Sequence, residues 1–210
     1  MKVVPVKTRI LTERDDIVKA VAEYTRGQVE ADDVIAVAES VLAITQGRAK
    51  RPEDMRPCFL AKILCRFFPQ KGSLSARHSM QALMEEEGRL RVLCAFVAGF
   101  LAKLAGRPGV FYQLAGEQAR LIDDVTGTMP PFDKHIVYGP RDSDKAAESI
   151  RIATGCRGAA IVDANDLQRA AVLGVSAGLD AKGLETILRD NPFGNDSQKT
   201  PIVIIKDYAA

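Results

Sequence analysis

The sequence of 210 residues has no tryptophan, two histidines, four cysteines and almost no excess of one charge. Its formal net charge of +2 is too small to indicate a nucleic-acid partner. The histidines lie far apart and no two cysteines form a CxxC pair, so a zinc site is not expected. These absences exclude a disulfide scaffold and give no indication of nucleic-acid binding. They do not select one functional class of protein.

The four cysteines lie in mostly apolar surroundings, which predicts buried packing thiols and a reducing compartment. They are Cys58, Cys65, Cys94 and Cys156. The N-terminus, MKVVPVKTRI, lacks the apolar core of a signal peptide. The most apolar stretch, residues 92–102, is about half as long as a bilayer span and predicts a buried core helix. We therefore expect a cytoplasmic protein with no membrane partner.

Two nucleotide-binding motifs are also missing. The sequence contains no GxxxxGK[ST], which excludes a P-loop NTPase, and no GxGxxG opening a βα unit, which argues against a dinucleotide-binding fold. Any nucleotide site in this chain must therefore be built in another way.

Apolar periodicity predicts strands and helices in a mixed order. Strands are expected at 3–10, 34–38, 119–122, 135–138, 158–162, 170–177 and 201–206, and helices at 14–26, 79–105, 142–153 and 179–189. Pro5 favours an edge position for the first strand. The fold class is therefore α/β (α+β), a mixed sheet with a helical middle region. We expect a single domain over 1–210 with a helical insertion or subdomain at 50–115.

Two acidic clusters follow predicted strands. Asp123 and Asp124 come after RLI, and Asp163, Asn165 and Asp166 come after AAIV. In α/β folds ligands collect beyond the carboxyl ends of strands, and carboxylate oxygens suit Mg²⁺ or Mn²⁺. The sequence therefore predicts a metal site here. The structural alternative is that Asp163 caps a turn and Asn165 supports a left-handed residue.

A third polar segment, residues 190–201, precedes the last strand. It combines turn formers with amides, hydroxyls and one lysine. Backbone N–H groups made available at Gly194, together with the charge of Lys199, are suited to a phosphate group. A plain surface loop is the alternative.

The small net charge hides an asymmetry. Residues 1–115 carry 18 basic against 13 acidic side chains, whereas 116–210 carry 11 against 14. The stretch 48–77 alone holds eight basic residues. We expect the acids of the second part to hold metal and the bases of the first to attract an anionic substrate, although such runs are commonly solvated helix faces.

Several segments together resemble the coenzyme F-420 γ-glutamyl ligases. The opening PVKTRILTERDDI and then DDVIAVAESVLAITQGR are similar to that family's N-terminal pattern. LIDDVTG and IVDAND look like the family's two metal-binding Asp segments. Between them, YGPRDSDKAAESIR resembles the family's Pro-containing lead-in and the helix that follows it. NPFGNDSQKTPIVII resembles its nucleotide-contacting loop and last strand. The resemblance covers about 1–50 and 115–206, and it implies a γ-glutamyl-ligase-like fold.

The resemblance implies a GTP- and divalent-metal-dependent ligase that adds L-glutamate in γ linkage to a phosphorylated deazaflavin-type acceptor through an acyl phosphate. It also implies a homodimer. Mg²⁺ or Mn²⁺ would be the metal and GTP a substrate. The implied metal ligands are Asp123 or Asp124, Asp163 and Asn195. The implied nucleotide-binding residues are Glu39, Ser40, Thr126, Asn165, Gly194, Asp196, Ser197, Gln198, Lys199 and Thr200. No catalytic residue is assigned.

The sequence departs from the family pattern at two positions, Ile44 in place of a lysine and Ala164 in place of a metal-binding threonine. Each replaces a chemically active side chain with a hydrocarbon. The departures keep open a diverged, non-catalytic nucleotide- or metabolite-binding protein. A metal-dependent phosphohydrolase, which needs only carboxylates and a water, is a third hypothesis.

Overall fold

The computed structural model describes residues 1–208 apart from 71, 123–129, 166–167 and 195–197. The described chain forms two compact units, one of Met1–Arg48 with Pro140–Ala210 and the other of Ala49–Gly139. The expected single domain with a helical insertion at 50–115 stays a prediction.

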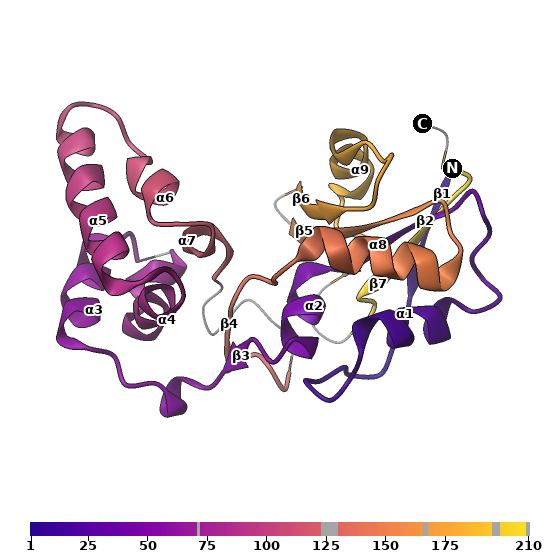
Figure 1. Cartoon of the computed structure of the whole chain (residues 1–210), viewed down its shortest axis with the longest axis horizontal. Helices are drawn as coiled ribbons and strands as arrows, with labels where there is room; N and C mark the ends of the chain where they lie inside the picture. The colour runs from indigo at the N-terminus through magenta and orange to yellow at the C-terminus, as the bar shows by residue number, and fades with distance from the viewer. Residues whose placement is uncertain (71, 123–129, 166–167, 195–197, 209–210) are drawn as a thin grey trace. The chain divides into compact units, whose positions relative to one another are not determined.

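The first unit is built on a five-stranded mixed sheet with the strand order β1-β7-β2-β5-β6 (Figure 1). Its strands are β1 (Lys2–Val6), β2 (Val34–Ala38), β5 (Gly158–Asn165), β6 (Arg169–Val175) and β7 (Ile202–Lys206). β2 and β5 pair in parallel and every other neighbouring pair is antiparallel. The predicted mixed α/β class is confirmed, and the strand containing Pro5 lies at an edge as expected.

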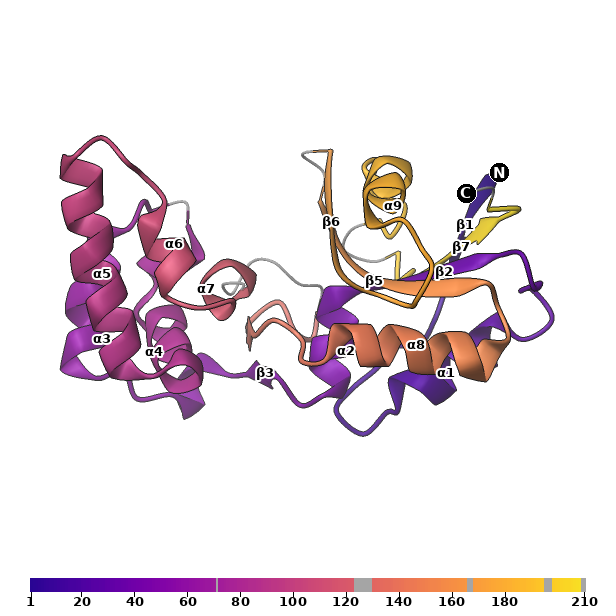
Figure 2. The same ribbon diagram turned by 45° about the horizontal axis from the view of Figure 1, so that its top comes forward.

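Helices cover both faces of this sheet. The helices are α1 (Ile17–Thr25), α2 (Glu39–Thr45), α8 (Ser143–Thr154) and α9 (Ala181–Leu188). Figure 2 shows α1 and α8 on one face and α9 on the other. The central strands β2, β5 and β7 alternate between the two cores: Ile35 and Ile161 pack with α1 and α8, whereas Ala36 and Val162 pack with α9. This alternation explains why the central strands appear as continuous apolar runs in the sequence.

The second unit is mainly helical. Its helices are α3 (Phe59–Leu64), α4 (Arg77–Glu87), α5 (Arg89–Leu104), α6 (Val110–Leu114) and α7 (Gln118–Leu121). Three short 3₁₀ turns, Pro52–Asp54, Cys65–Phe67 and Ser73–Ser75, and a two-stranded sheet of β3 (Ala49–Lys50) and β4 (Ile136–Val137) complete it. Its core is a single apolar cluster that includes Met80, Leu83 and Tyr138.

Two sequence predictions for this unit are wrong. The strand expected at 119–122 is the short helix α7, because glutamine, alanine, arginine and leucine are all good helix formers. The stretch 92–102 is helical, but it is not a buried core helix: only Val92 and Ala95 of α5 are buried.

The prediction of buried thiols is wrong for one cysteine, which lies on the exposed side of α5. Cys94 is exposed and Cys58 is half-buried, whereas Cys65 and Cys156 are buried as expected. Within the described residues, no helix combines the length and the apolar character that crossing a bilayer requires. A cytoplasmic location stays a prediction.

Candidate functional site at one edge of the sheet

The parallel pairing of β2 and β5 brings two acidic residues to the same end of the sheet, where both strands have their carboxyl ends. This end of the sheet is called the site edge below. Ala38, the last residue of β2, is in register with Val162 of β5, so Glu39 and Asp163 are the residues that follow this pair. Glu39 opens α2 and Ser40 follows it, both half-buried. Both residues therefore lie where a doubly wound sheet commonly binds ligands.

The polar loop before β7 reaches the same edge. β7 runs antiparallel to β2 with Ile202 in register with Val37, and the Ala38 N–H donates to the Pro201 carbonyl at 2.9 Å. The Thr8 N–H donates to the Lys199 carbonyl at 2.8 Å, which fixes the end of the loop beside the chain after β1. The fold thus brings Lys199 and Thr200 to the edge that carries Glu39 and Asp163.

The Gly194 amide does not play the predicted part. Its N–H donates to the Asn191 carbonyl at 3.1 Å and closes a turn, so this group is not available to a phosphate. Gly194 has a φ of +69°, and a Cβ there would overlap the Gln198 side chain. Thr200 Oγ1 donates to the Phe193 carbonyl, so the two ends of the loop are tied together.

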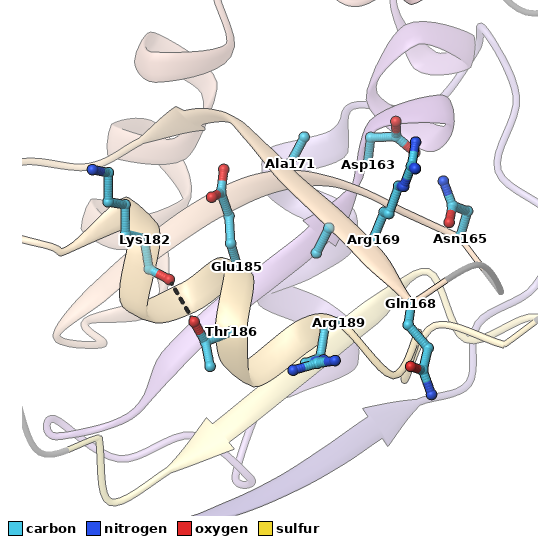
Figure 3. Close-up of a pocket in the computed structure, with 10 residues that line it drawn as sticks. Asp163, Asn165, Gln168, Arg169, Ala171, Lys182, Glu185, Thr186 and Arg189 are labelled. Carbon is cyan, nitrogen blue, oxygen red and sulfur yellow. Dashed lines mark hydrogen bonds between the residues drawn. The ribbon is translucent and has the colours of Figure 1, made fainter.

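A cleft of about 750 Å³ opens beside Asp163, between the β5–β6 hairpin and α9. Figure 3 shows Asp163, Asn165 and Arg169 on the hairpin and Lys182, Glu185 and Thr186 on the helix. Gln168, Ala170, Ala171 and Arg189 complete the lining. The volume lies in the range of sites that hold small molecules.

Asp163 is a half-buried carboxylate without a compensating cation. Burial raises the pKa of the Asp163 carboxyl above its ordinary value. None of the ion pairs or side-chain hydrogen bonds between described residues involves it. A carboxylate in this state gains most from a bound cation, because the cation removes the cost of burying its charge.

The described residues give only part of a metal site. Among them no three His, Cys, Asp or Glu side chains lie close enough to hold an ion. The predicted ligands Asp123, Asp124 and Asn195 lie outside the described residues, as do Thr126, Asp196 and Ser197. The donor chemistry of Asp163 nevertheless fits a hard divalent cation.

Reasoning from the sequence missed the helix side of the cleft. Polar side chains follow one another along α9 at spacings of three, one and three residues, which places them on one side of the helix. They are Lys182, Glu185, Thr186 and Arg189. That spacing was visible in the sequence and could have revealed them. All the cations that line the cleft come from residues 116–210, not from the basic 48–77 stretch.

The fold and site define an α/β protein with acidic and basic groups gathered at one sheet edge, an arrangement suited to anionic substrates and a cation. The family model described as F420-0:Gamma-glutamyl ligase matches residues 5–206. The chain belongs to this family, and the membership supports a γ-glutamyl ligase of coenzyme F-420 biosynthesis. No curated protein matches the chain.

Proposed function

We propose that the protein is a GTP- and divalent-metal-dependent ligase that joins L-glutamate in γ linkage to a phosphorylated, deazaflavin-type acceptor. The observation that carries the proposal is Asp163, a half-buried carboxylate that forms no ion pair with any described residue and lies where the ends of β2, β5 and β7 meet. Family membership supplies the reaction class.

Each group at the edge has a role in this reaction. Asp163 and Glu39 offer carboxylate oxygens to the cation, with Asp123 or Asp124 and Asn195 as further ligands. A divalent cation supplies charge neutralisation at the transferring phosphoryl group. Lys199 and Ser40 bind phosphate oxygens of the nucleotide, and Thr200, whose hydroxyl donates to the Phe193 carbonyl, holds the nucleotide loop in place. Asn165, Gln198 and the turn at Gly194 orient the nucleotide beside them.

The proposed ligation takes two steps, and neither step changes an oxidation state. The acceptor carboxylate attacks the γ-phosphorus of GTP, GDP leaves, and an acyl phosphate forms. The amine of glutamate then attacks the acyl carbon, phosphate leaves with the bonding electrons, and the amine proton passes to solvent.

The test is an incubation of the purified protein with GTP, Mn²⁺, L-glutamate and the deglutamylated acceptor F420-0. The expected product has gained one glutamyl unit, and GDP forms in equal amount. GDP formation in the absence of acceptor would instead indicate a phosphohydrolase.

The alternative is a diverged, non-catalytic binding protein, and two observations favour it. The Ile44 side chain, on α2, is buried, and Ala164 packs against the apolar cluster under α9. Neither position therefore carries a functional group. In that case the same incubation would give no GDP and no product, although calorimetry would still detect nucleotide binding.

We also propose the homodimer that the family implies, and the exposed side of α5 supports it. Leu90, Cys94, Val97, Leu101 and Leu104 are all exposed and recur at spacings of four and three. Such a stripe is the seam of a helix that packs against another helix. A two-fold axis would pair this stripe with itself in a second copy.

Leu101→Glu is expected to weaken this dimer by about 30-fold or more, because it places a charge in an apolar seam. Light scattering after gel filtration would show the loss of dimer. Phe59→Glu is the control, since Phe59 is 79% exposed and lies outside the stripe. A wild-type protein that is monomeric would contradict the proposal.

A further inference from the structure

The chain crosses between the two units at two places that lie side by side. It leaves the first unit after Arg48 and returns to it at Pro140. In the second unit the two crossing segments pair as β3 and β4, with Ala49 in register with Val137. Each unit has its own apolar core on its side of the crossings. The two units are therefore joined by two short, adjacent links.

Two glutamines anchor the returning link, one in each unit. In the second unit the Gly139 N–H donates to Oε1 of the buried Gln118 at 3.0 Å, and Gln118 Nε2 donates to the Gly139 carbonyl at 3.4 Å. In the first unit the Arg141 N–H donates to Gln46 Oε1 at 2.9 Å, and Gln46 Nε2 donates to the Arg141 carbonyl at 2.8 Å. A glutamine amide is both donor and acceptor, so it can hold both backbone groups of one residue. Pro140 is the residue between the two anchored ones.

The link that leaves the first unit is anchored by the end of α2. The Gly47 N–H donates to the Ile44 carbonyl and the Arg48 N–H donates to the Ala43 carbonyl, both at 2.9 Å. Gly47 has a φ of +69°, as is common for a glycine that ends a helix. Gln46, which anchors the returning link, directly precedes this glycine. The end of α2 thus fixes both links on the side of the first unit.

Short, anchored links restrict how two units can move. Two adjacent links resist twisting and separation of the units, and they leave bending about the line that joins them. Pro140 narrows the motion further, because its ring fixes φ and leaves rotation mainly to ψ. Gly139 is required for close packing, since a Cβ there would overlap the Leu121 side chain. Protein hinges consist of a few such residues at the ends of regular elements.

We propose that the links 48–49 and 139–141 form a two-stranded hinge about which the second unit swings as a rigid body. Gln46 and Gln118 are the anchors that keep this hinge short. The hinge is a property of the fold and does not depend on the proposed function. α2 connects it with the site edge, since this helix begins with Glu39 and ends beside Gln46. A swing at the hinge therefore acts on the helix that presents Glu39.

The test measures distance distributions between pairs of nitroxide labels by pulsed electron paramagnetic resonance. One pair spans the hinge, at Lys19→Cys on α1 and Arg77→Cys on α4. A reference pair lies within the first unit, at Lys19→Cys and Lys182→Cys on α9. All three positions are exposed, and the accessible Cys58 and Cys94 are replaced by serine. An excess of unlabelled protein removes distances between different chains.

The pair across the hinge is expected to give a distribution at least about twice as wide as the reference pair, because a hinge rotation on the order of 15° adds to the label motion that both pairs share. Gln46→Ala should widen this distribution further, since Arg141 then joins the unanchored part of the link. Gln28→Ala is the matched control, because Gln28 also donates to a backbone carbonyl, that of Tyr24 at 2.9 Å, but away from the links. Equal widths for the two label pairs in the wild type would overturn the hinge. A Gln46→Ala distribution like that of the wild type would overturn the anchoring by Gln46.

Discussion

The Asp163→Asn variant is expected to lose at least about 100-fold in kcat/KM for ligation, because a metal contact to a phosphoryl group is worth several kcal/mol and each 1.4 kcal/mol is about tenfold. Asparagine keeps the shape of the side chain and removes the negative charge that the cation requires. The measurement is the rate of GDP formation at saturating Mn²⁺. Asp32→Asn, at an exposed position before β2, is the control and should retain full activity.

The same substitution should leave the metal-free protein as stable as the wild type or more stable. Because the folded-state pKa of Asp163 is raised, its contribution to stability is present at low pH and is lost as the pH rises through that pKa. At neutral pH the wild type therefore bears the cost of a buried charge, which asparagine removes. Thermal melts in EDTA should show an equal or higher Tm for the variant. A lower Tm would mean that Asp163 has a structural role.

Asp33→Ala is expected to destabilise the first unit by about 3 kcal/mol, the lower part of the range for breaking a buried ion pair. The Asp33 side chain is 2% exposed and pairs with Lys206 Nζ at 2.7 Å. It also accepts the backbone N–H groups of Glu30 at 2.8 Å and Asp207 at 3.2 Å. Its removal leaves these donors unsatisfied between β2 and β7, while Lys206, 24% exposed at its side chain, regains partial hydration.

Urea unfolding at neutral pH measures this loss as a midpoint lower by about 1–2 M. Burial alone would raise the pKa of Asp33, but the hydrogen bonds from Lys206, Glu30 and Asp207 outweigh it and lower the pKa. The stabilisation is therefore complete above the ordinary carboxyl pKa of 3.8 and is lost as the pH falls through the lowered value. The difference between wild type and variant should shrink in acid. A difference that stays constant down to low pH would contradict the ion-pair explanation.

The central sheet could be predicted because its strands are buried on both faces. The runs 34–38 and 158–162 are apolar at every position, and the structure places β2 and the first part of β5 there. Their parallel pairing could not be read from the sequence, since more than a hundred residues separate them. That pairing is what brings Glu39 beside Asp163.

Two failures have the same physical cause, which is that apolar content does not by itself fix burial or backbone type. RLI at 120–122 is apolar enough for a strand, yet helix propensity and the packing of Ala119 produce α7. The stretch 92–102 is apolar around much of α5, but one side packs against its unit and the other is exposed. The exposed side does not belong to the core, and it is the side through which we propose that two copies pair.

The candidate site could be predicted only where chemistry follows a strand end. Asp163 satisfied that rule, whereas Lys182 and Arg189 lie on a helix whose polar side faces the cleft. Such residues resemble any solvated helix surface until the β5–β6 hairpin is placed opposite them.

The central claim is that Asp163 marks the metal and phosphoryl-transfer site, and a crystal soaked with Mn²⁺ and a non-hydrolysable GTP analogue tests it most directly. The account predicts an anomalous manganese peak within about 2.3 Å of an Asp163 carboxylate oxygen, in contact with the nucleotide phosphates. Manganese and nucleotide bound together elsewhere, with Asp163 contacting neither, would contradict it.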